Sequence, residues 1–495
     1  MTFSSRIYQK LSKPVIWTFT TYFAEGLPYT IIRTISSLFF RDQGMSLEGL
    51  GATSIFGLPW VLKFLWGPLV DTFSTKRKWL LITETILCCL FFLVAICAPL
   101  QYSVDFIVAL FFLGSFVAAT HDIAIDGFYM EILDHSQQAK YVGYRVMAYR
   151  IAMMTGTGVV ATLGALYGWR AGFLAADITL LVVLILHYFI LPKNEQARGK
   201  ISHQLTFFFR SHALKIIAMA GLLIALRIFH QSSLWQNILT DVPILKKLTY
   251  PSIIALLLFS SLIIVWLSRR RLHQVILNHP ENFYAKSFLS FMDRPRIGTI
   301  LAFIIMIRAG EYMLSAMYAP FMVDLGLKVH YGWISAGIGL PSSIIGALAG
   351  GWFISNYGLK KMIWPFLFLQ NITNLLYMFL ALSLAGILAI NTANPTPIPL
   401  SNIQMLEIVA MQAFDQFSGG LGTAVLMTFL MRICCLEYKA THYAIGTGLM
   451  SISGLYAGVI SGFVTSWVGY GLFFGISFLA SIPGMVLAWF VPLDE

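Results

Sequence analysis

The sequence predicts an all-α polytopic membrane protein with about fourteen transmembrane helices. Two observations predict this class: the mean hydropathy of the 495 residues is +0.76, and only 11% of them are charged. Soluble domains carry about 25% charged residues. The third observation is the length of the apolar runs, because a helix needs about 20 apolar residues to cross a bilayer, whereas a barrel strand needs only about 10. This composition excludes a disordered chain and a string of soluble domains.

The apolar runs form two sets of six with a pair between them. Residues 1–192 and residues 297–495 are each predicted to form a six-helix bundle. Residues 193–296 are predicted to form a linker with two extra transmembrane helices and a basic cytoplasmic segment at 269–296. The predicted spans are 15–39, 50–70, 79–99, 104–128, 143–167, 171–191, 212–230, 249–268, 297–318, 333–355, 361–389, 404–431, 441–466 and 470–491.

Lysine and arginine are distributed unevenly, and this predicts the orientation. With the N-terminus inside, 23 of the 33 residues fall in inside segments, five in outside loops and five within spans. Cytoplasmic loops of membrane proteins carry such an excess, so both termini are predicted to be cytoplasmic. The net charge of +11 thus lies beside the bilayer rather than on a nucleic-acid-binding face, and no nucleic-acid partner is expected.

The sequence gives no indication of a metal site, a cofactor or an enzyme. His121 and His442 are too isolated for metal ligation, and the five cysteines have no zinc or disulfide spacing. The sequence contains no zinc-binding helix, no nucleophile elbow and no phosphate loop.

Ionisable residues within spans are candidate functional residues, because a charge there costs roughly 2.5–3.5 kcal/mol on insertion scales. Asp122 and Asp126 are four residues apart, so they lie on one helix face, where like charges favour a proton on one of them. One interpretation is a proton carrier facing a cavity. The other is a structural pair neutralised by Lys63, Arg145 or Arg150. For Asp126, its position nearer the cytoplasmic end also favours a gating ion pair.

The second half contains a similar set of residues. Arg308 and Glu311 are three residues apart on one face, so Glu311 could carry a proton, while Arg308 could hold an anion or mask Glu311. Asp415 lies in a polar stretch at 412–418, which precedes glycines that let helices approach closely. Function and packing are both open for this stretch.

Other polar residues in the spans have simpler predicted roles. Gly26 and Pro28 follow Glu25 and are predicted to interrupt the first span where it lines a cavity or packs on neighbours. Arg33 is predicted to snorkel to the outer interface. Glu84 and Asp177 are near enough to span ends to be interfacial.

A repeated pattern follows one span in each half: a glycine-bearing helix end, a short polar turn and a basic cluster. It resembles the loop motif of the major facilitator superfamily, although Asn356 replaces the acidic residue in the second copy. Repeated signals in two sets of six helices are typical of parallel repeats around a central cavity. The predicted gating-loop residues are Gly67, Asp71, Arg77, Lys78, Lys360 and Lys361.

Eight stretches carry distinctive motifs: 25–28, 57–71, 121–127, 143–150, 168–170, 308–311, 419–423 and 440–444. These motifs resemble those of the AmpG-type muropeptide permeases, a branch of that superfamily that also includes acetyl-coenzyme A transporters. The resemblance covers both six-span halves, whereas the insert at 193–296 departs from the family pattern. Arg308 and Glu311 stand where the family tends to have lysine and aspartate, and Asp415 where it tends to have glutamate.

The resemblance implies a major facilitator fold and proton-driven import of N-acetylglucosaminyl-1,6-anhydro-N-acetylmuramyl peptides across a bacterial inner membrane for cell-wall recycling. The alternative cargo is acetyl-coenzyme A or a siderophore on the same fold. The partners expected are a small anionic substrate, protons and lipid, with the protein a monomer. The predicted proton-coupling residues are Asp122, Asp126, Glu311, Asp415 and Glu25, and the predicted substrate-binding residues are Lys63, Arg150, Arg308, Gln416 and Tyr22.

Overall fold

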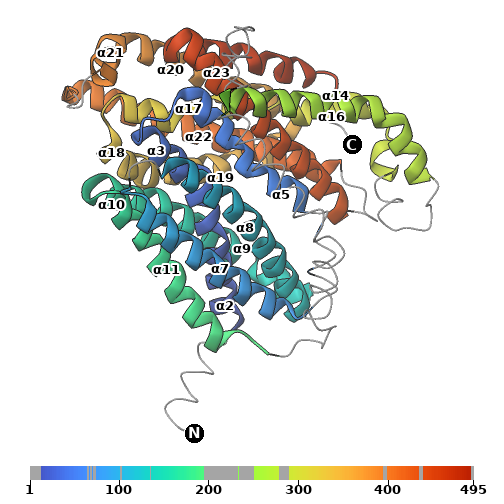
Figure 1. Cartoon of the computed structure of the whole chain (residues 1–495). Helices are drawn as coiled ribbons and strands as arrows, with labels where there is room; N and C mark the ends of the chain where they lie inside the picture. Colours follow the sequence, from blue (N-terminus) through green and yellow to red (C-terminus); the bar gives the residue numbers. More distant parts are fainter. Residues whose placement is uncertain are drawn as a thin grey trace.

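The structure is a computed structural model, and the residues that it describes form helices and no strand (Figure 1). They are residues 13–63, 66, 70, 74–100, 103–133, 135–193, 232–233, 250–277, 289–393, 398–433 and 439–491. The elements of the first half are α2 (Pro14–Thr30), η1 (Ile31–Ile35), α3 (Ser36–Asp42), α4 (Leu47–Ala52), η2 (Thr53–Gly57), α5 (Leu58–Leu62), α7 (Lys76–Cys97), α8 (Val104–Ile132), α9 (His135–Met154), η4 (Thr155–Val160), α10 (Ala161–Tyr167) and α11 (Trp169–Ile190).

The second half follows a helix of the insert, α14 (Tyr250–Leu277), which packs against α4 and α23. The elements of this half are α16 (Ile297–Met306), α17 (Ala309–Asp324), α18 (Lys328–Gly332), η6 (Trp333–Gly339), α19 (Leu340–Tyr357), α20 (Leu359–Ser383), α21 (Ala385–Ala393), α22 (Asn402–Arg432) and α23 (Lys439–Leu487).

The predicted fold class is confirmed. Among the described residues, eight helices are long and apolar enough to cross a membrane. The predicted span at 212–230 lies outside the described residues, and the division at 192 and 296 stays a prediction. The span predicted at 361–389 forms two helices, α20 and α21. Helix α14 continues through the basic residues 269–271 to Leu277. The last two predicted spans form one element, α23, with a kink at Gly469, whose φ is 74°.

The predicted break in the first span is wrong. Helix α2 continues through Gly26 and Pro28, and the Thr30 hydroxyl donates to the Gly26 carbonyl at 2.7 Å. Gly26 instead permits close packing, because a Cβ there would lie 3.0 Å from the Tyr149 carbonyl oxygen on α9. The irregularity follows the proline, as the π-helical turn η1.

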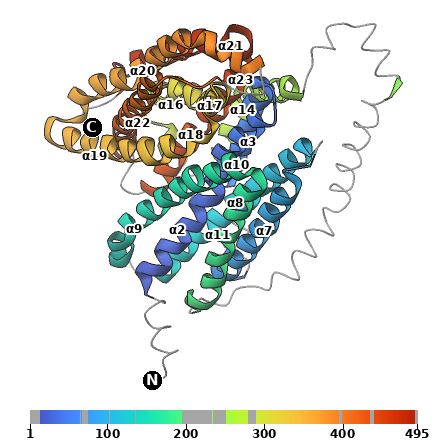
Figure 2. The same ribbon diagram turned by 90° about the vertical axis from the view of Figure 1, so that its left-hand side faces the viewer.

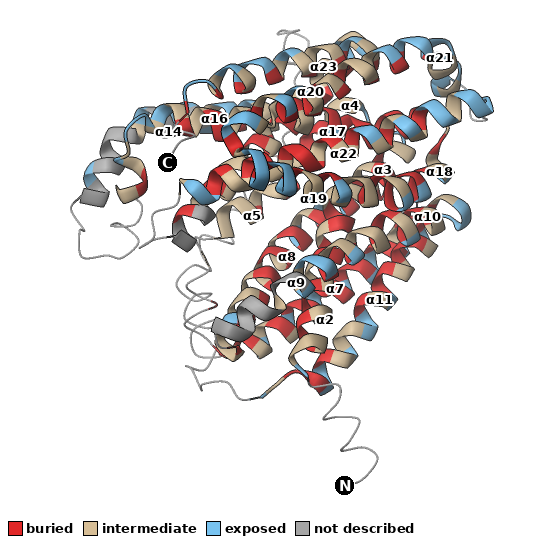
Figure 3. Cartoon of the chain, turned by 180° about the vertical axis from the view of Figure 1, so that it is seen from behind, coloured by how far each residue is buried: buried red, intermediate tan, exposed pale blue. Residues whose placement is uncertain are grey.

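The apolar core shows how the two halves meet. One cluster of buried residues contains Phe39 and Phe40 of α3 together with Phe321 and Tyr470 of the second half. At the opposite end of the helices, each half has its own separate cluster, one around Trp17 and the other around Phe429. Figure 2 shows the same arrangement, with the far ends of α9 and α19 lying apart, and Figure 3 shows buried residues running through both halves.

Candidate functional site

The first half places Lys63 and Asp122 in contact. Lys63 follows α5, and its Nζ lies 2.6 Å from Asp122 Oδ2 on α8. The side chain of Asp122 is 9% exposed and that of Lys63 is 34% exposed, although both fall within predicted spans. The pair therefore borders accessible space instead of lying sealed within the bundle.

Asp126 has a different cation. Arg145 Nη2 lies 2.8 Å from Asp126 Oδ1, and the Tyr22 hydroxyl donates to the same oxygen at 2.7 Å. The Arg145 guanidinium also covers the Tyr22 ring, 4.1 Å from its centroid. Asp126 thus pairs within its own half, and Tyr22, predicted to bind substrate, is a buried donor to this carboxylate.

Glu25 completes this group of acids. It lies within electrostatic reach of Asp122, Asp126, Lys63 and Arg145. Its buried Oε2 has no hydrogen-bond partner among the described residues. Three carboxyl groups therefore share two cations here.

The second half builds its own group around Glu311. Arg308 donates from Nε to Glu311 Oε2 at 2.7 Å and from Nη2 to Oε1, and Gln370 also donates to Glu311. Asp415 is buried and accepts from Gln416 Nε2 at 3.1 Å. In the part of the chain that the structure describes, Asp415 forms no ion pair.

The glycines after this polar stretch do more than bring helices together. A Cβ on Gly422 would lie 1.6 Å from Gln370 Oε1, and one on Gly419 would lie 3.4 Å from Glu311 Oε1. These positions hold space for the two side chains that form the Glu311 group. A Cβ on Gly420 would lie 2.3 Å from the Ser343 carbonyl oxygen, so this glycine does permit the close approach of α19 and α22.

The helix that carries Arg308 is broken at that residue. Helix α16 ends at Met306 and α17 begins at Ala309, with Arg308 at φ −112° between them. The Ser453 hydroxyl of α23 donates to the Ile305 carbonyl at 2.6 Å, satisfying a backbone group beside the break. Non-helical backbone within a membrane is tolerated where the protein satisfies it and where it lines a site.

Arg150 lies on α9 of the first half, and Arg308 lies between α16 and α17 of the second half. They are close enough for their like charges to interact. Among the described residues, Arg150 forms no ion pair with a carboxylate. Tyr312 on α17 is similarly within electrostatic reach of Tyr29 and Arg33 of the first half. Side chains of the two halves therefore come within electrostatic reach of one another around Arg308 and Tyr312.

The halves are joined at the opposite end from the separate cores by a set of ion pairs, here called the latch. The Arg41 guanidinium donates twice to Asp324, both bonds at 2.6 Å, and the Tyr470 hydroxyl donates to Asp324 at 2.7 Å. Asp42 accepts from Lys328 Nζ at 2.7 Å. Each half thus contributes one cation and one acid.

Glycines bring the two halves close together at two further contacts. A Cβ on Gly51 would lie 2.9 Å from the Gly458 carbonyl oxygen, and one on Gly332 would lie 2.9 Å from the Gly158 carbonyl oxygen. The first contact joins α4 to α23, and the second joins α18 to η4. The halves are therefore closed against one another at the latch end.

Several sequence-based expectations need correction. Arg33 does not snorkel outward, because it donates to the Ser54 carbonyl at 2.8 Å and its guanidinium packs on Gly57. Glu84 is not interfacial but fully buried, with His187 Nδ1 3.0 Å from its carboxylate oxygens, and Asp177 is buried too.

The predicted gating loops are only partly described. Gly67 and Asp71 lie outside the described residues. Arg77 donates to the Tyr188 carbonyl at 2.7 Å within its own half, while Lys78, Lys360 and Lys361 are exposed. Gly358, with φ 83°, joins α19 directly to α20.

These features define a membrane transporter built from two helical halves, and the chain belongs to the Major Facilitator Superfamily, whose family model matches residues 18–393. Among its relatives is the anhydromuropeptide permease of Escherichia coli, 21% identical over 94% of this chain and 77% of that protein. An uncharacterized protein of Haemophilus influenzae is 24% identical over 99% of this chain and 97% of its own length. The resemblance to AmpG-type permeases is thereby confirmed.

Solved structures agree on the fold. The peptide transporter POT in complex with sulfate covers 96% of this chain with a TM-score of 0.65 at 14% identity, and 93% of that chain is matched. The nucleoside transporter NupG also covers 96%, with a TM-score of 0.56 at 13% identity and 99% of that chain matched.

Proposed function

We propose that this chain is a proton-coupled transporter that imports anhydro-muropeptides across a bacterial inner membrane for cell-wall recycling. The observation that carries the proposal is the set of ion pairs inside the spans of both halves, Lys63 with Asp122 in the first half and Arg308 with Glu311 in the second. Arg150 of the first half is close enough to Arg308 for their charges to interact. Anhydro-muropeptides bear peptide carboxylates, which arginine binds in a bidentate manner. The related Escherichia coli permease supports this substrate class.

The proton has a defined place in this proposal. Glu25, Asp122 and Asp126 share the two cations Lys63 and Arg145, so a single proton balances the group. A proton on Asp122 weakens its contact with Lys63, whose ammonium then becomes available to a substrate carboxylate. Proton binding and substrate binding are thereby coupled through one lysine.

The latch sets the accessible side. In this proposal the end opposite the latch, which is predicted to be cytoplasmic, is the accessible side, because the halves pair at the latch and have separate cores at the other end. Import then requires the latch to open and the far ends to close, by rocking of one half against the other.

Uptake of labelled anhydro-muropeptide into energised membrane vesicles tests the function. Wild-type protein accumulates the substrate, and a protonophore abolishes the accumulation. Asp122→Asn abolishes accumulation but retains exchange of external for internal substrate, because Lys63 no longer needs a proton to be released. Asp105→Asn, on an exposed residue of the same helix, is the control and behaves as wild type. Wild-type accumulation that ignores the protonophore would rule out proton coupling.

The cargo is tested separately by ligand-induced thermal stabilisation of the purified protein. Anhydro-muropeptide is expected to raise the unfolding temperature, whereas acetyl-coenzyme A and a ferric siderophore are not. Stabilisation by a siderophore alone would replace the proposed cargo while leaving the transporter assignment intact.

A further inference from the structure

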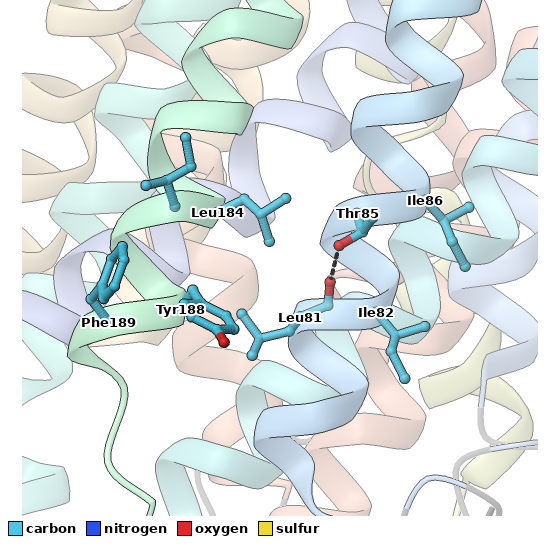
Figure 4. A pocket seen from close by; sticks show the side chains of 8 residues that line it. Leu81, Ile82, Thr85, Ile86, Leu184, Tyr188 and Phe189 are labelled. Carbon is cyan, nitrogen blue, oxygen red and sulfur yellow. Dashed lines mark hydrogen bonds between the residues drawn. The ribbon is translucent and has the colours of Figure 1, made fainter. Parts of the chain in front are cut away.

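A groove of about 680 Å³ lies on the outer face of the first half, between α7 and α11. Its walls are aliphatic and aromatic, and Figure 4 shows Leu184 and Tyr188 projecting from α11 into the space beside Leu81 and Thr85 of α7. The Thr85 hydroxyl is already bonded to the Leu81 carbonyl at 2.7 Å, so the wall offers little polarity. Both helices belong to the membrane-spanning set, so hydrocarbon rather than water faces the groove.

Along the membrane normal, the groove covers about the thickness of one leaflet of the bilayer. Leu81 and Ile86 stand five and ten residues from the start of α7, which is about 8 to 15 Å along a helix. Half of the hydrocarbon core is about 15 Å thick. The groove therefore extends from near one membrane surface to the middle of the bilayer.

Cations lie at the shallow end. Arg77 joins the two helices there by donating to the Tyr188 carbonyl at 2.7 Å. Lys78 is exposed one turn before Ile82, and Lys193 is exposed just after the end of α11. Basic residues where transmembrane helices meet the cytoplasmic surface bind anionic lipid headgroups.

We propose that this groove is a binding site for an anionic diacyl phospholipid of the leaflet on the side of Lys78, with an acyl chain between α7 and α11 and the headgroup phosphate on Lys78 and Lys193. The apolar walls and the cationic end fit the two parts of such a molecule in the correct order. A second transmembrane helix would fill the walls but leave the cations unexplained. The site is separate from the one between the halves, and it does not depend on the transported substrate.

Lipid titration of the purified full chain, followed by native mass spectrometry, tests the site with dioleoyl phosphatidylglycerol and dioleoyl phosphatidylcholine as probes. Wild-type protein binds one phosphatidylglycerol more tightly than any phosphatidylcholine. Lys78→Gln with Lys193→Gln lowers that affinity roughly 30-fold, about fivefold for each lysine. Leu184→Trp fills the groove and lowers binding of both lipids.

Two variants provide matched controls. Lys361→Gln removes an exposed lysine after the corresponding turn of the second half, and Leu348→Trp enlarges a side chain that is 71% exposed on α19; neither changes binding. Equal affinity for the two lipids, equal loss in the controls, or crosslinking of residues 194–231 or of a second copy into the groove would overturn the proposal. The lysine variants alter exposed side chains, so the test survives if Leu184→Trp fails to fold.

Discussion

Replacing Asp324 by asparagine is expected to open the latch end about a hundredfold more often. Arg41 and Asp324 form two hydrogen bonds of 2.6 Å, with side chains 18% and 7% exposed. Exposed ion pairs contribute about 0.2–1 kcal/mol, whereas unpairing one member of a buried pair costs about 3–5 kcal/mol. In the variant, Arg41 keeps its bond to the Met45 carbonyl and some hydration. We therefore expect the closed latch to lose about 2.7 kcal/mol of stability relative to the open one, which raises the open fraction by a factor of about 100.

Thiol labelling measures this opening. In a background without the five native cysteines, Thr162→Cys places a thiol against α18, because a Cβ on Gly332 would lie 2.1 Å from Thr162 Oγ1. A membrane-impermeant maleimide reaches this thiol only when the halves separate. Asp324→Asn raises the labelling rate about 100-fold, and the exchange Arg41→Asp with Asp324→Arg returns most of the protection. Arg170→Ala, on an exposed residue at the same end, leaves the rate unchanged.

Two outcomes would refute this reasoning. A rise of less than about threefold would place the pair in the range of exposed ion pairs. Failure of the charge exchange to restore protection, in a protein that still folds and binds substrate, would show that Asp324 acts through something other than its pairing with Arg41.

Two further predictions concern stability, both measured by thermal unfolding in detergent. Gly346→Ala is expected to lower the free energy of unfolding by about 1–3 kcal/mol, because its Cβ would lie 2.0 Å from the Phe417 carbonyl oxygen. Gly351→Ala on the same helix is the control and is neutral or stabilising, because its Cβ meets nothing within 4 Å. Equal effects of the two changes would contradict this prediction. His187→Ala is expected to lower the free energy of unfolding by about 3–5 kcal/mol, because it leaves the Glu84 carboxylate buried and unpaired. Adding Glu84→Gln removes the buried charge and recovers part of the loss. If it recovers nothing, packing and not charge determines the loss.

The spans and the acids of the site could be predicted from the sequence because both are local signals. Hydropathy marks each span, and an acid within a span is conspicuous. The cation partners needed the structure: Lys63 is 59 residues from Asp122, and the sequence allowed three candidates for the Asp122 and Asp126 pair. The contacts give Asp122 and Asp126 one cation each, Lys63 and Arg145 respectively, and leave Glu25 without an ion pair among the described residues.

Features that depend on contacts between helices could not be predicted. The Glu84 and His187 pair joins residues 103 apart and requires knowing that α7 packs on α11. The break before α17 has no sequence signal, because the residues that form it, Ile307 and Arg308, are neither glycine nor proline. It is supported instead by the Ser453 hydroxyl of α23. The latch is similar, because its outside-loop cations are visible in the sequence but their partners depend on how the halves meet.

The like charges of Arg150 and Arg308 give the proposed transport cycle a reason to need its substrate. Arg150 and Arg308 are close enough for their like charges to interact, and if closure of the halves in the proposed cycle brings them closer, they repel more strongly as water leaves. Arg308 is masked by Glu311, but Arg150 has no carboxylate partner among the described residues. An anionic substrate between them replaces repulsion with two charge-assisted contacts, so closure is favourable with cargo and unfavourable without it. In the proposed cycle, the charges that bind the substrate thus also disfavour passage of the empty protein through the closed state, which would leak protons.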